Sequence, residues 1–262
     1  MNNMPEYATF TQLGNLGKLG NQMFQIAMTI AYAIDTGKEY AFPKWGYSKY
    51  MIKELPGGFF IKIDHLITAE YHYVPLPNMP GNVDMWNSFG QSAKYFAHRW
   101  NEIKPYFTLK PEYYKYIWNK YDHILSEKTC SIHVRRTDYT TPANLEFHGV
   151  MPISYYEQGA EILYGTNKPE NVTFVIFSDD PQWCKENFNF PQQVFIEGEQ
   201  NIIDMFFMSM CKNHIICNSS FSWWGAFLND EHGKKTVCPK NWFGKACPHS
   251  SKDVPVDGWI VI

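Results

Sequence analysis

The sequence predicts an α/β protein made of two lobes, and three observations support this prediction. The chain of 262 residues is long enough for two ordinary domains. Residues 7–42 have the pattern of a strand, a glycine-rich loop, a helix and a second strand. Beyond residue 130, short apolar strands alternate with helical segments, which is typical of a doubly wound parallel sheet. We expect an amino-terminal lobe over residues 1–126 and a carboxy-terminal lobe over residues 127–262.

The amino-terminal lobe opens with a strand at residues 7–13 and a helix whose apolar residues recur from 23 to 34. Three glycines mark the loop between them, namely Gly14, Gly17 and Gly20. Their spacing matches neither the dinucleotide fingerprint nor the phosphate-binding Walker loop. We expect this loop to deliver Asn21 to the helix N-terminus, a place that can accept a ligand oxygen. The alternative is that Asn21 only caps the helix.

Residues 43–121 have no sustained periodicity and are rich in proline, glycine and aromatic residues. We expect loops and short elements there, which could form an acceptor surface. A helix is expected after Pro111, reaching Tyr121, and the linker between the lobes is expected near residues 126–129.

The carboxy-terminal lobe has the more regular pattern. The expected strands are residues 130–135, 172–178, 194–196, 214–217 and 236–238, and the expected helices are residues 154–164, 181–187, 201–211 and 222–229. Polar clusters directly follow three of the strands, at residues 135–138, 178–180 and 218–220. Because open parallel sheets bind ligands at the carboxyl ends of their strands, we expect the three clusters to line one edge.

Two arginines are the most informative residues of these clusters. Arg135 and Arg136 stay charged at any ordinary pH, and their planar forks match the oxygens of a phosphate. Strand alternation places His133 and Arg135 on one face and Arg136 elsewhere. The pattern predicts a diphosphate ligand. The alternative is a structural network in which the arginines pair with carboxylates such as Asp138.

The two other clusters suit a nucleotide as well. Ser219 and Ser220 precede a helix, where hydroxyl and backbone N–H groups together with the helix dipole favour phosphate. Asp179 or Asp180 could accept hydrogen bonds from the N1–H and exocyclic amine of guanine. The alternative for this pair is that one of them caps the helix that starts at Pro181.

Composition excludes several classes of protein. With 45% hydrophobic and 19% charged residues the chain is expected to fold, and its net charge of -3 gives no attraction to nucleic acid. The 17% of aromatic residues suits a carbohydrate ligand, although core packing is the alternative. No apolar run is long enough to span a membrane and the start lacks a signal-peptide pattern, so we expect a cytoplasmic protein that could dock at the membrane surface.

The cysteines and carboxylates do not indicate a metal. None of the six cysteines lies in a Cys-x-x-Cys pair, and buried reduced thiols are expected. A zinc site at Cys211, His214 and Cys217 lacks a fourth ligand nearby. The sequence has no Asp-x-Asp and no His-Glu-x-x-His. Charge on a leaving diphosphate would therefore have to be met by a fixed cation, for which Arg135 is the candidate.

Four sequence blocks resemble the α-1,2-fucosyltransferases of glycosyltransferase family 11. They are Gly17-Lys-Leu-Gly-Asn-Gln-Met-Phe-Gln25, His133-Val-Arg-Arg-Thr-Asp138, Phe177-Ser-Asp-Asp-Pro-Gln-Trp183 and Asn218-Ser-Ser-Phe-Ser-Trp-Trp-Gly-Ala226. They occur in the order that the family shows. The resemblance implies a GT-B-like fold with two Rossmann-like lobes and the donor in the cleft between them. It also implies GDP-fucose as donor, inversion at the fucose anomeric carbon and no metal or other cofactor.

The resemblance also implies roles for individual residues. Arg135 would contact the diphosphate as the most sensitive position, and Asn21 would face the donor from the other lobe. Catalytic positions would be Arg135, Asn21 and Asp138, and donor-binding positions would be Gly20, His133, Arg136, Asp179, Asp180, Ser219, Ser220 and Phe221. Lys18 departs from the family, which usually has arginine there, and this puts a bidentate contact of that side chain in doubt.

The acceptor is the part that the sequence describes least. The resemblance implies a terminal galactose in an oligosaccharide or a lipid-linked glycan. No general base stands out, and Asp138, Glu146 and His148 are only nearby candidates. The alternative functions are fucose transfer to another position, use of a different nucleotide sugar, and glycan binding without catalysis.

Overall fold

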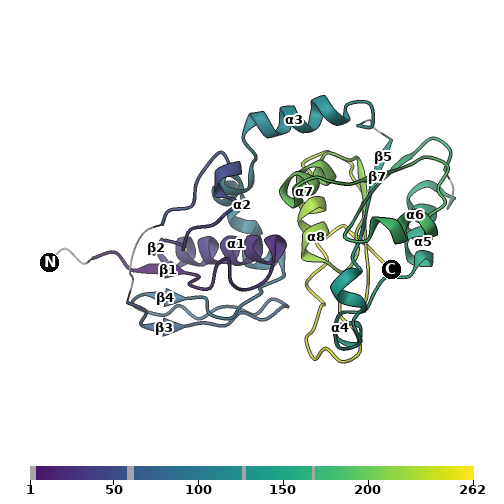
Figure 1. Ribbon diagram of the computed structural model, residues 1–262. Coiled ribbons are helices and arrows are strands. Elements are labelled where there is room, and N and C mark those ends of the chain that lie inside the picture. Colours follow the sequence, from purple (N-terminus) through teal and green to yellow (C-terminus); the bar gives the residue numbers. More distant parts are fainter. Residues whose placement is uncertain (1–3, 58–61, 126–127, 167–168) are drawn as a thin grey trace. The chain divides into compact units, whose positions relative to one another are not determined.

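A computed structural model describes residues 4–57, 62–125, 128–166 and 169–262 (Figure 1). The chain forms two compact units, one of Met1–Lys110 with His249–Val256, and one of Pro111–Pro248 with Asp257–Ile262. The boundary expected between residues 126 and 127 lies outside the described residues. The units divide earlier, before helix α3 (Pro111–Tyr121), because α3 packs on helix α7 (Asn201–Ser209). The Tyr121 and Phe207 rings stack there with centroids 4.4 Å apart.

The first unit contains a four-stranded parallel sheet in the order β2-β1-β4-β3. Its strands are β1 (Tyr7–Thr9), β2 (Glu39–Tyr40), β3 (His65–Leu66) and β4 (Val83–Asp84). The expected strand, helix and parallel strand at the start of the chain are confirmed. The prediction for residues 43–121 missed β3 and β4, because strands of two residues are too short to show alternation.

Helix α1 (Leu19–Thr36) begins earlier than expected, so Gly20 and Asn21 lie in its first turn and not in a loop before it. Lys18 occupies the N-cap position without a side-chain cap, so the alternative of Asn21 as the cap is wrong. Gly17, with φ of 74°, ends the preceding loop in a conformation that favours glycine. The helix ends at Gly37, as the sequence predicts, with φ of 68°.

The rest of the first unit consists of loops and short helices, as expected for residues 43–121. They are α2 (Trp100–Ile103) and the 3-10 helices Ser48–Tyr50, Ala93–Tyr95, Ala97–Arg99 and Lys104–Phe107. The segment 249–256 returns to this unit late in the chain. Asp253 anchors it by accepting from Lys94 Nζ at 2.5 Å and from the Tyr73 backbone at 3.0 Å.

The second unit contains a six-stranded parallel sheet in the order β10-β9-β8-β5-β6-β7. Its strands are β5 (Thr129–Val134), β6 (Thr173–Ser178), β7 (Gln193–Ile196), β8 (Asn213–Ile215), β9 (Thr236–Cys238) and β10 (Ile260–Val261). All six residues of β5 are buried, as befits a central strand of a parallel sheet. The predicted parallel sheet is confirmed, and only β10 was not foreseen.

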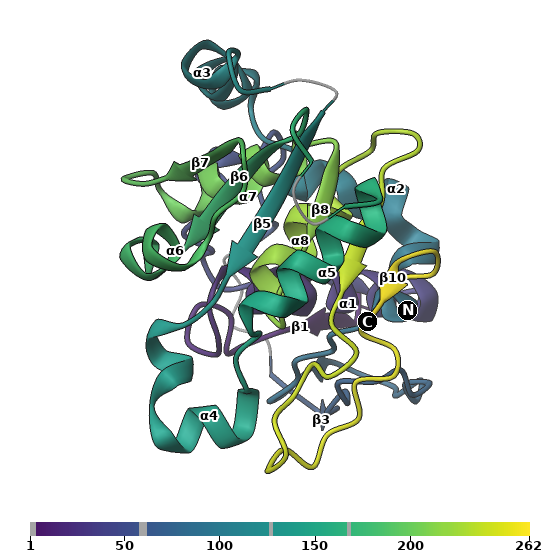
Figure 2. The same cartoon turned by 90° about the vertical axis from the view of Figure 1, so that its right-hand side faces the viewer.

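Helices cover both faces of this sheet (Figure 2). One face packs against α5 (Ile153–Tyr164) and α6 (Pro181–Asn187), which contribute Tyr156 and Cys184 to the core. The other face meets α7 and α8 (Ser220–Phe227), where the Phe177 ring packs edge-on against Phe207. Helix α8 begins at Ser220, two residues before the expected start, because the Ser219 side chain caps it.

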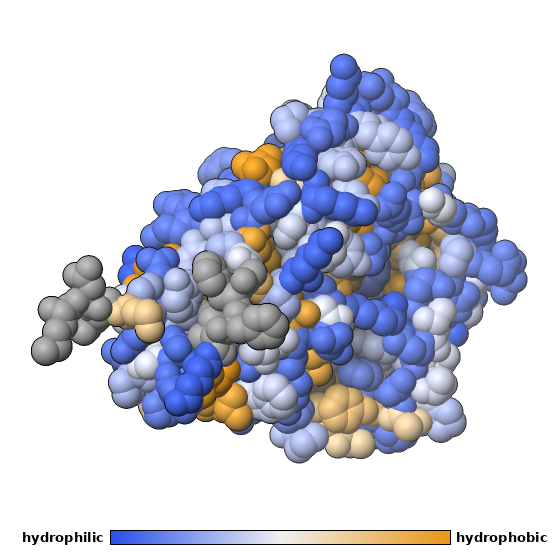
Figure 3. Space-filling model, turned by 60° about the vertical axis from the view of Figure 1, so that its left-hand side comes forward, coloured by the Kyte–Doolittle hydropathy of each residue, from blue (hydrophilic) through white to orange (hydrophobic). Residues whose placement is uncertain are grey.

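Buried thiols are confirmed for five of the six cysteines, and Cys247 is partly exposed. None of the helices within the described ranges has the length and apolar character needed to cross a bilayer. On the face drawn in Figure 3, hydrophobic residues form small patches scattered among hydrophilic ones. Many aromatic side chains, Trp223 and Trp224 among them, are fully buried, so core packing accounts for these.

Candidate functional site

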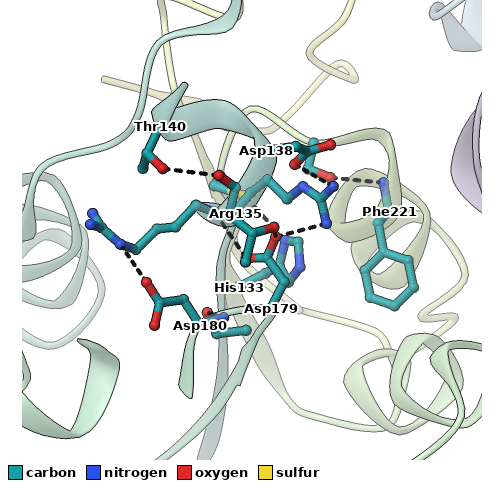
Figure 4. A network of polar contacts seen from close by, with 12 residues as sticks. His133, Arg135, Asp138, Thr140, Asp179, Asp180 and Phe221 are labelled. Atoms are coloured by element: carbon teal, nitrogen blue, oxygen red, sulfur yellow. Dashed lines mark hydrogen bonds and ion pairs between the residues drawn. The ribbon is translucent and has the colours of Figure 1, made fainter. Parts of the chain in front are cut away.

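Three polar clusters meet at the carboxyl edge of the second sheet (Figure 4). Strand β5 lies between β6 and β8, and all three run parallel, so the residues that follow them emerge side by side. This arrangement brings residues 135–138, 179–180 and 217–221 together, as the sequence predicts. The edge is therefore the candidate ligand site of this unit.

Arg135 is held at both ends of its guanidinium fork. Its NH1 lies 2.9 Å from Asp179 Oδ2, and its NH2 lies 2.5 Å from Asp138 Oδ1. The Asp179 side chain is 20% exposed and that of Asp138 is 43% exposed, although the Asp138 Oδ1 that meets Arg135 is itself buried. The Tyr139 ring lies below the guanidinium, with its centroid 5.5 Å away. The carboxylate network that the sequence left as an alternative is present.

Asp179 is the inner anchor of the network. Its Oδ1 accepts from the Arg136 backbone N–H at 2.9 Å, and its Oδ2 accepts from the Thr137 hydroxyl as well as from Arg135. Charge-assisted hydrogen bonds of this kind are among the strong ones. This carboxylate therefore fixes the backbone turn that follows β5 and the position of the arginine fork.

Arg136 points away from Arg135, as strand alternation predicts. Its Nε lies 3.1 Å from Asp180 Oδ2, and its guanidinium lies over the Trp183 ring at 3.9 Å from the centroid. Asp180 also accepts from the Trp183 backbone N–H at 3.3 Å and so caps α6. The expectation that one of the two aspartates caps this helix is confirmed. The role of Trp183 was not predicted, since its only signal is its place in the first turn of the helix.

His133 is buried beneath this edge. Its Nδ1 lies 3.1 Å from Cys217 Sγ, and the Phe221 ring packs against it with centroids 5.2 Å apart. Burial lowers the pKa of His133 to about 3, and the nearby charges of Asp179 and Arg135 act in opposite directions. The imidazole is therefore neutral at physiological pH. Cys217 was not predicted as a site residue, because a cysteine at the end of an apolar run reads as core.

The third cluster forms the start of α8. Ser219 Oγ accepts from the Phe221 backbone N–H at 3.3 Å, so its side chain is used as the helix cap. Ser220, the first residue of the helix, is partly exposed. The N–H groups of a first helical turn and the helix dipole favour an anion.

A short helix, α4 (Pro142–His148), follows the arginine motif and was not foreseen. Its last residue, His148, stacks on Tyr139 with ring centroids 4.3 Å apart. Burial lowers the pKa of His148, the charge of Asp138 opposes this effect and that of Arg135 adds to it. Of the three candidate bases, His148 and Asp138 therefore lie at the arginine network. The described contacts of Glu146 are made by its backbone carbonyl, which accepts from the Ala246 N–H at 3.0 Å.

Gly20 and Asn21 belong to the first unit. The Asn21 side-chain oxygen accepts from Gln91 Nε2 at 2.8 Å, and Gly20 is buried in the helix. The glutamines of the same sequence block hold the preceding loop, since Gln22 donates to the Gly17 carbonyl at 3.0 Å and Gln25 to the Leu16 carbonyl at 3.2 Å. Part of this block therefore serves the local fold.

No group of three or more His, Cys, Asp or Glu side chains suited to a metal ion occurs within the described ranges. His214, the central residue of the possible zinc string, is engaged at both ring nitrogens. Its Nδ1 lies 2.7 Å from Ser131 Oγ and its Nε2 lies 2.8 Å from Asn229 Nδ2. The charged groups of the site are thus two guanidiniums and three carboxylates, all on the side chains described above.

Comparison with known families gives a match over residues 3–262 to the model of glycosyl transferase family 11. The chain belongs to glycosyltransferase family 11. This family 11 enzyme is 31% identical to an α-1,2-colitosyltransferase of Escherichia coli, over 94% of this chain and 96% of that protein. It is 42% identical to the O-antigen biosynthesis glycosyltransferase WbnK of Escherichia coli, over 50% of this chain and 44% of that protein. A galactoside 2-α-L-fucosyltransferase of Bos taurus is 25% identical, over 86% of this chain and 66% of that protein.

The fold of this glycosyltransferase is similar to those of solved fucosyltransferases. The NodZ α-1,6-fucosyltransferase, in a crystal soaked with GDP-fucose, gives a TM-score of 0.54 at 13% identity, over 86% of this chain and 93% of that one. A mutant FUT1 of Arabidopsis thaliana in complex with GDP gives a TM-score of 0.53 at 12% identity, over 92% of this chain and 72% of that one. At these identities the likeness concerns the fold, an α/β architecture with parallel sheets.

Proposed function

We propose that this glycosyltransferase moves L-fucose from GDP-β-L-fucose to the 2-hydroxyl of a terminal galactose in a glycan. The transfer inverts the anomeric carbon and needs no metal. The observation that carries the proposal is the guanidinium of Arg135 at the carboxyl edge of a parallel sheet, held by one inner and one outer carboxylate. The α-1,2 specificity in the names of the relatives supports the linkage.

The nucleotide diphosphate takes the place of the outer carboxylate. The Asp138 side chain is 43% exposed, against 20% for Asp179, so Asp138 can release Arg135 NH2 more readily than Asp179 can release NH1. Asp179, which has three hydrogen-bonding partners, keeps the other end of the fork in place. Arg135 then meets the charge that grows on the leaving diphosphate with an orientation fixed before the ligand arrives.

The neighbouring groups supply the remaining donor contacts. Ser220 and the first turn of α8 donate to phosphate, while the hydroxyl of Ser219 keeps its place as the helix cap. Asp180 is more exposed than Asp179, with 33% against 20% for the side chains, and is the better candidate to accept from guanine. Gly20 and Asn21 of the first unit remain predicted contacts of the donor. The GT-B-like arrangement, with the donor between two lobes, also remains a prediction.

The reaction is a displacement at the anomeric carbon. The 2-hydroxyl oxygen of galactose forms a bond to that carbon while the bond to the β-phosphate oxygen breaks, and the bonding electrons leave with GDP. The hydroxyl proton passes to a base on the acceptor side. Neutral His148, or Asp138 once it has released Arg135, is available beside the arginine network for this step.

The test is a transfer assay with GDP-fucose and a panel of free and lipid-linked oligosaccharides that end in galactose. We expect a fucosylated product whose linkage, determined by NMR, is α-1,2. A product with another linkage would correct the regiochemistry, and no product across the panel would contradict the proposal. GDP binding without any transfer would favour a glycan-binding protein that has lost catalysis.

A second candidate is transfer of colitose, which the 31% identity to an α-1,2-colitosyltransferase favours. Colitose differs from fucose by the missing 3-hydroxyl. A site that hydrogen-bonds this hydroxyl would discriminate against the deoxy sugar by about 10⁴-fold, whereas an apolar pocket would accept both. Competition between GDP-fucose and GDP-colitose for one acceptor separates the two candidates by the ratio of their kcat/KM values.

A further inference from the structure

Cys217 contacts two of the predicted donor-binding residues, His133 and Arg135. It follows β8, the neighbour of β5, and its Sγ lies 3.1 Å from His133 Nδ1. The Arg135 backbone N–H also donates to this sulfur. Only 1% of Cys217 is exposed, so the thiol has no access to a ligand itself. Any influence of Cys217 on the ligand therefore passes through the residues that it contacts, among them His133 and Arg135.

Cys217 and neutral His133 each carry one proton, and the tautomer of His133 sets the direction of their hydrogen bond. Burial raises the pKa of the Cys217 thiol to about 12, although the hydrogen bond with Ser222 and the nearby Arg135 oppose the rise, so the thiol keeps its proton. His133 is neutral and carries a single ring proton. The nearest side-chain acceptor for the thiol proton is His133 Nδ1 at 3.1 Å, since Ser222 Oγ lies at 3.8 Å.

A thiol that donates to Nδ1 leaves the ring proton of His133 on Nε2. Within the described part of the chain, no residue is hydrogen-bonded to this Nε2, and the atom is not among the fully buried polar atoms without a partner. Nε2 therefore keeps a small exposed surface, in a residue that is 6% exposed as a whole. In this tautomer it offers a hydrogen-bond donor, whereas the other tautomer would present a lone pair and repel an anion.

We propose that Cys217 is a positioning residue that holds His133 in the Nε2–H tautomer, so that the neutral ring donates a hydrogen bond to a phosphate oxygen of the nucleotide diphosphate. This inference rests on the proposed function, because it assigns the ligand of the ring to the same donor. A neutral donor does not depend on protonation. The contribution of His133 to GDP binding is accordingly constant between pH 6 and pH 8.

The experiment compares Cys217→Ser, which keeps a donor, with Cys217→Ala and Cys217→Val, which remove it. Valine fills the volume that alanine leaves empty, so Cys217→Val should stay folded while it lacks the hydrogen-bond donor. Cys238→Ala is the matched control, because Cys238 is equally buried and its sulfur contacts the Pro239 carbonyl. Nitrogen-15 NMR of labelled histidine reports the tautomer, with the His133 signals assigned by their loss in His133→Gln. Calorimetry gives the Kd for GDP.

We expect the Nε2–H tautomer in the wild type, in Cys217→Ser and in Cys238→Ala, and its loss in Cys217→Ala and Cys217→Val. The Kd for GDP should rise about tenfold in these last two variants and stay within about threefold in the others, as one lost hydrogen bond implies. A wild type with the Nδ1–H tautomer, or unchanged GDP affinity in Cys217→Val, would overturn the role of Cys217. A wild type that binds no GDP would instead overturn the proposed function.

Discussion

Arg135 is the residue on which the proposed chemistry depends most directly. Its fork already points along the sheet edge because Asp179 holds NH1, and the outer NH2 is paired with a carboxylate that water reaches. Such preorganisation places a positive charge where the leaving group develops negative charge. The lysine at position 18, which lacks a planar fork, cannot offer the same geometry.

We expect Arg135→Ala to lower kcat/KM by at least about 100-fold, because one positioned charge contributes about 3 kcal/mol to transition-state stabilisation. The far-UV circular dichroism should stay that of the wild type. Steady-state kinetics with GDP-fucose measure the effect. Arg99→Ala is the matched control, since Arg99 pairs with Asp35 and Glu102 in the first unit. Turnover of Arg135→Ala within tenfold of the wild type would contradict the role.

The two carboxylates on Arg135 should differ in their effect on stability. Asp179→Asn removes a charge that has three hydrogen-bonding partners, so we expect the free energy of unfolding to fall by about 2 kcal/mol. Asp138→Asn alters a pair whose carboxylate side chain is 43% exposed, so we expect a smaller loss of about 1 kcal/mol or less. Urea denaturation of both variants measures the difference. Equal losses would argue against an exchangeable outer carboxylate.

At the scale of elements, the packing of α7 against α8 sets the position of the Ser219–Phe221 cluster. Gly225 lies in α8 where the helix approaches α7, and a Cβ at this position would meet Met208 Sδ at 2.5 Å. The two helices therefore leave no room for a Cβ at position 225 unless the Met208 side chain shifts. The start of α8, and with it Ser220, depends on this contact between two helices.

Gly225→Ala should lower the free energy of unfolding by about 1 to 3 kcal/mol, because the added methyl group overpacks the interface between α7 and α8. Combination with Met208→Ala removes the clashing side chain. The double variant should therefore be more stable than the sum of the two single losses predicts. Thermal or urea unfolding of the four proteins measures this coupling, and strict additivity would mean that the helices move apart instead.

At the scale of the whole molecule, two buried histidines make stability depend on pH. Burial lowers the pKa of His133 and of His214 to about 3 in each case, from an ordinary value of 6.5. The unfolded chain then binds more protons than the folded chain between these values, so stability is lost as pH falls from about 6.5 towards 3. The two ring nitrogens of His214 contact the neutral side chains of Ser131 and Asn229, and this environment favours a neutral imidazole.

We expect the midpoint of thermal unfolding to fall steadily as the pH is lowered from 6.5 to 4. Each of the two histidines should lower the free energy of unfolding by up to about 1.4 kcal/mol per pH unit. Differential scanning calorimetry across this range measures the slope. His214→Gln, which keeps a polar side chain of similar length, should make the slope shallower. A midpoint that stays constant from pH 7 to pH 5 would contradict the assignment.

The sequence by itself determined most of the strands and helices of the second unit, without α4 and β10, and it identified three polar clusters that follow strands. These features are local, because apolar periodicity and residues such as Gly37 act over a few positions. The sequence also predicted Arg135 and Asp180, which the structure places in the candidate site. It missed β3, β4 and β10, which are too short for a pattern, and the start of α1, which depends on the conformation of Gly17.

Only the tertiary structure decided which polar groups meet. The pairing of Arg136 with Asp179 and Asp180 joins residues 43 and 44 positions apart, and that of His133 with Cys217 joins residues 84 positions apart. These pairings follow from the strand order β8-β5-β6, which no local periodicity encodes. The sequence places Cys217 in an apolar run, as a core residue. The strand order brings it to His133 as a proposed partner, because two strands distant in sequence end side by side.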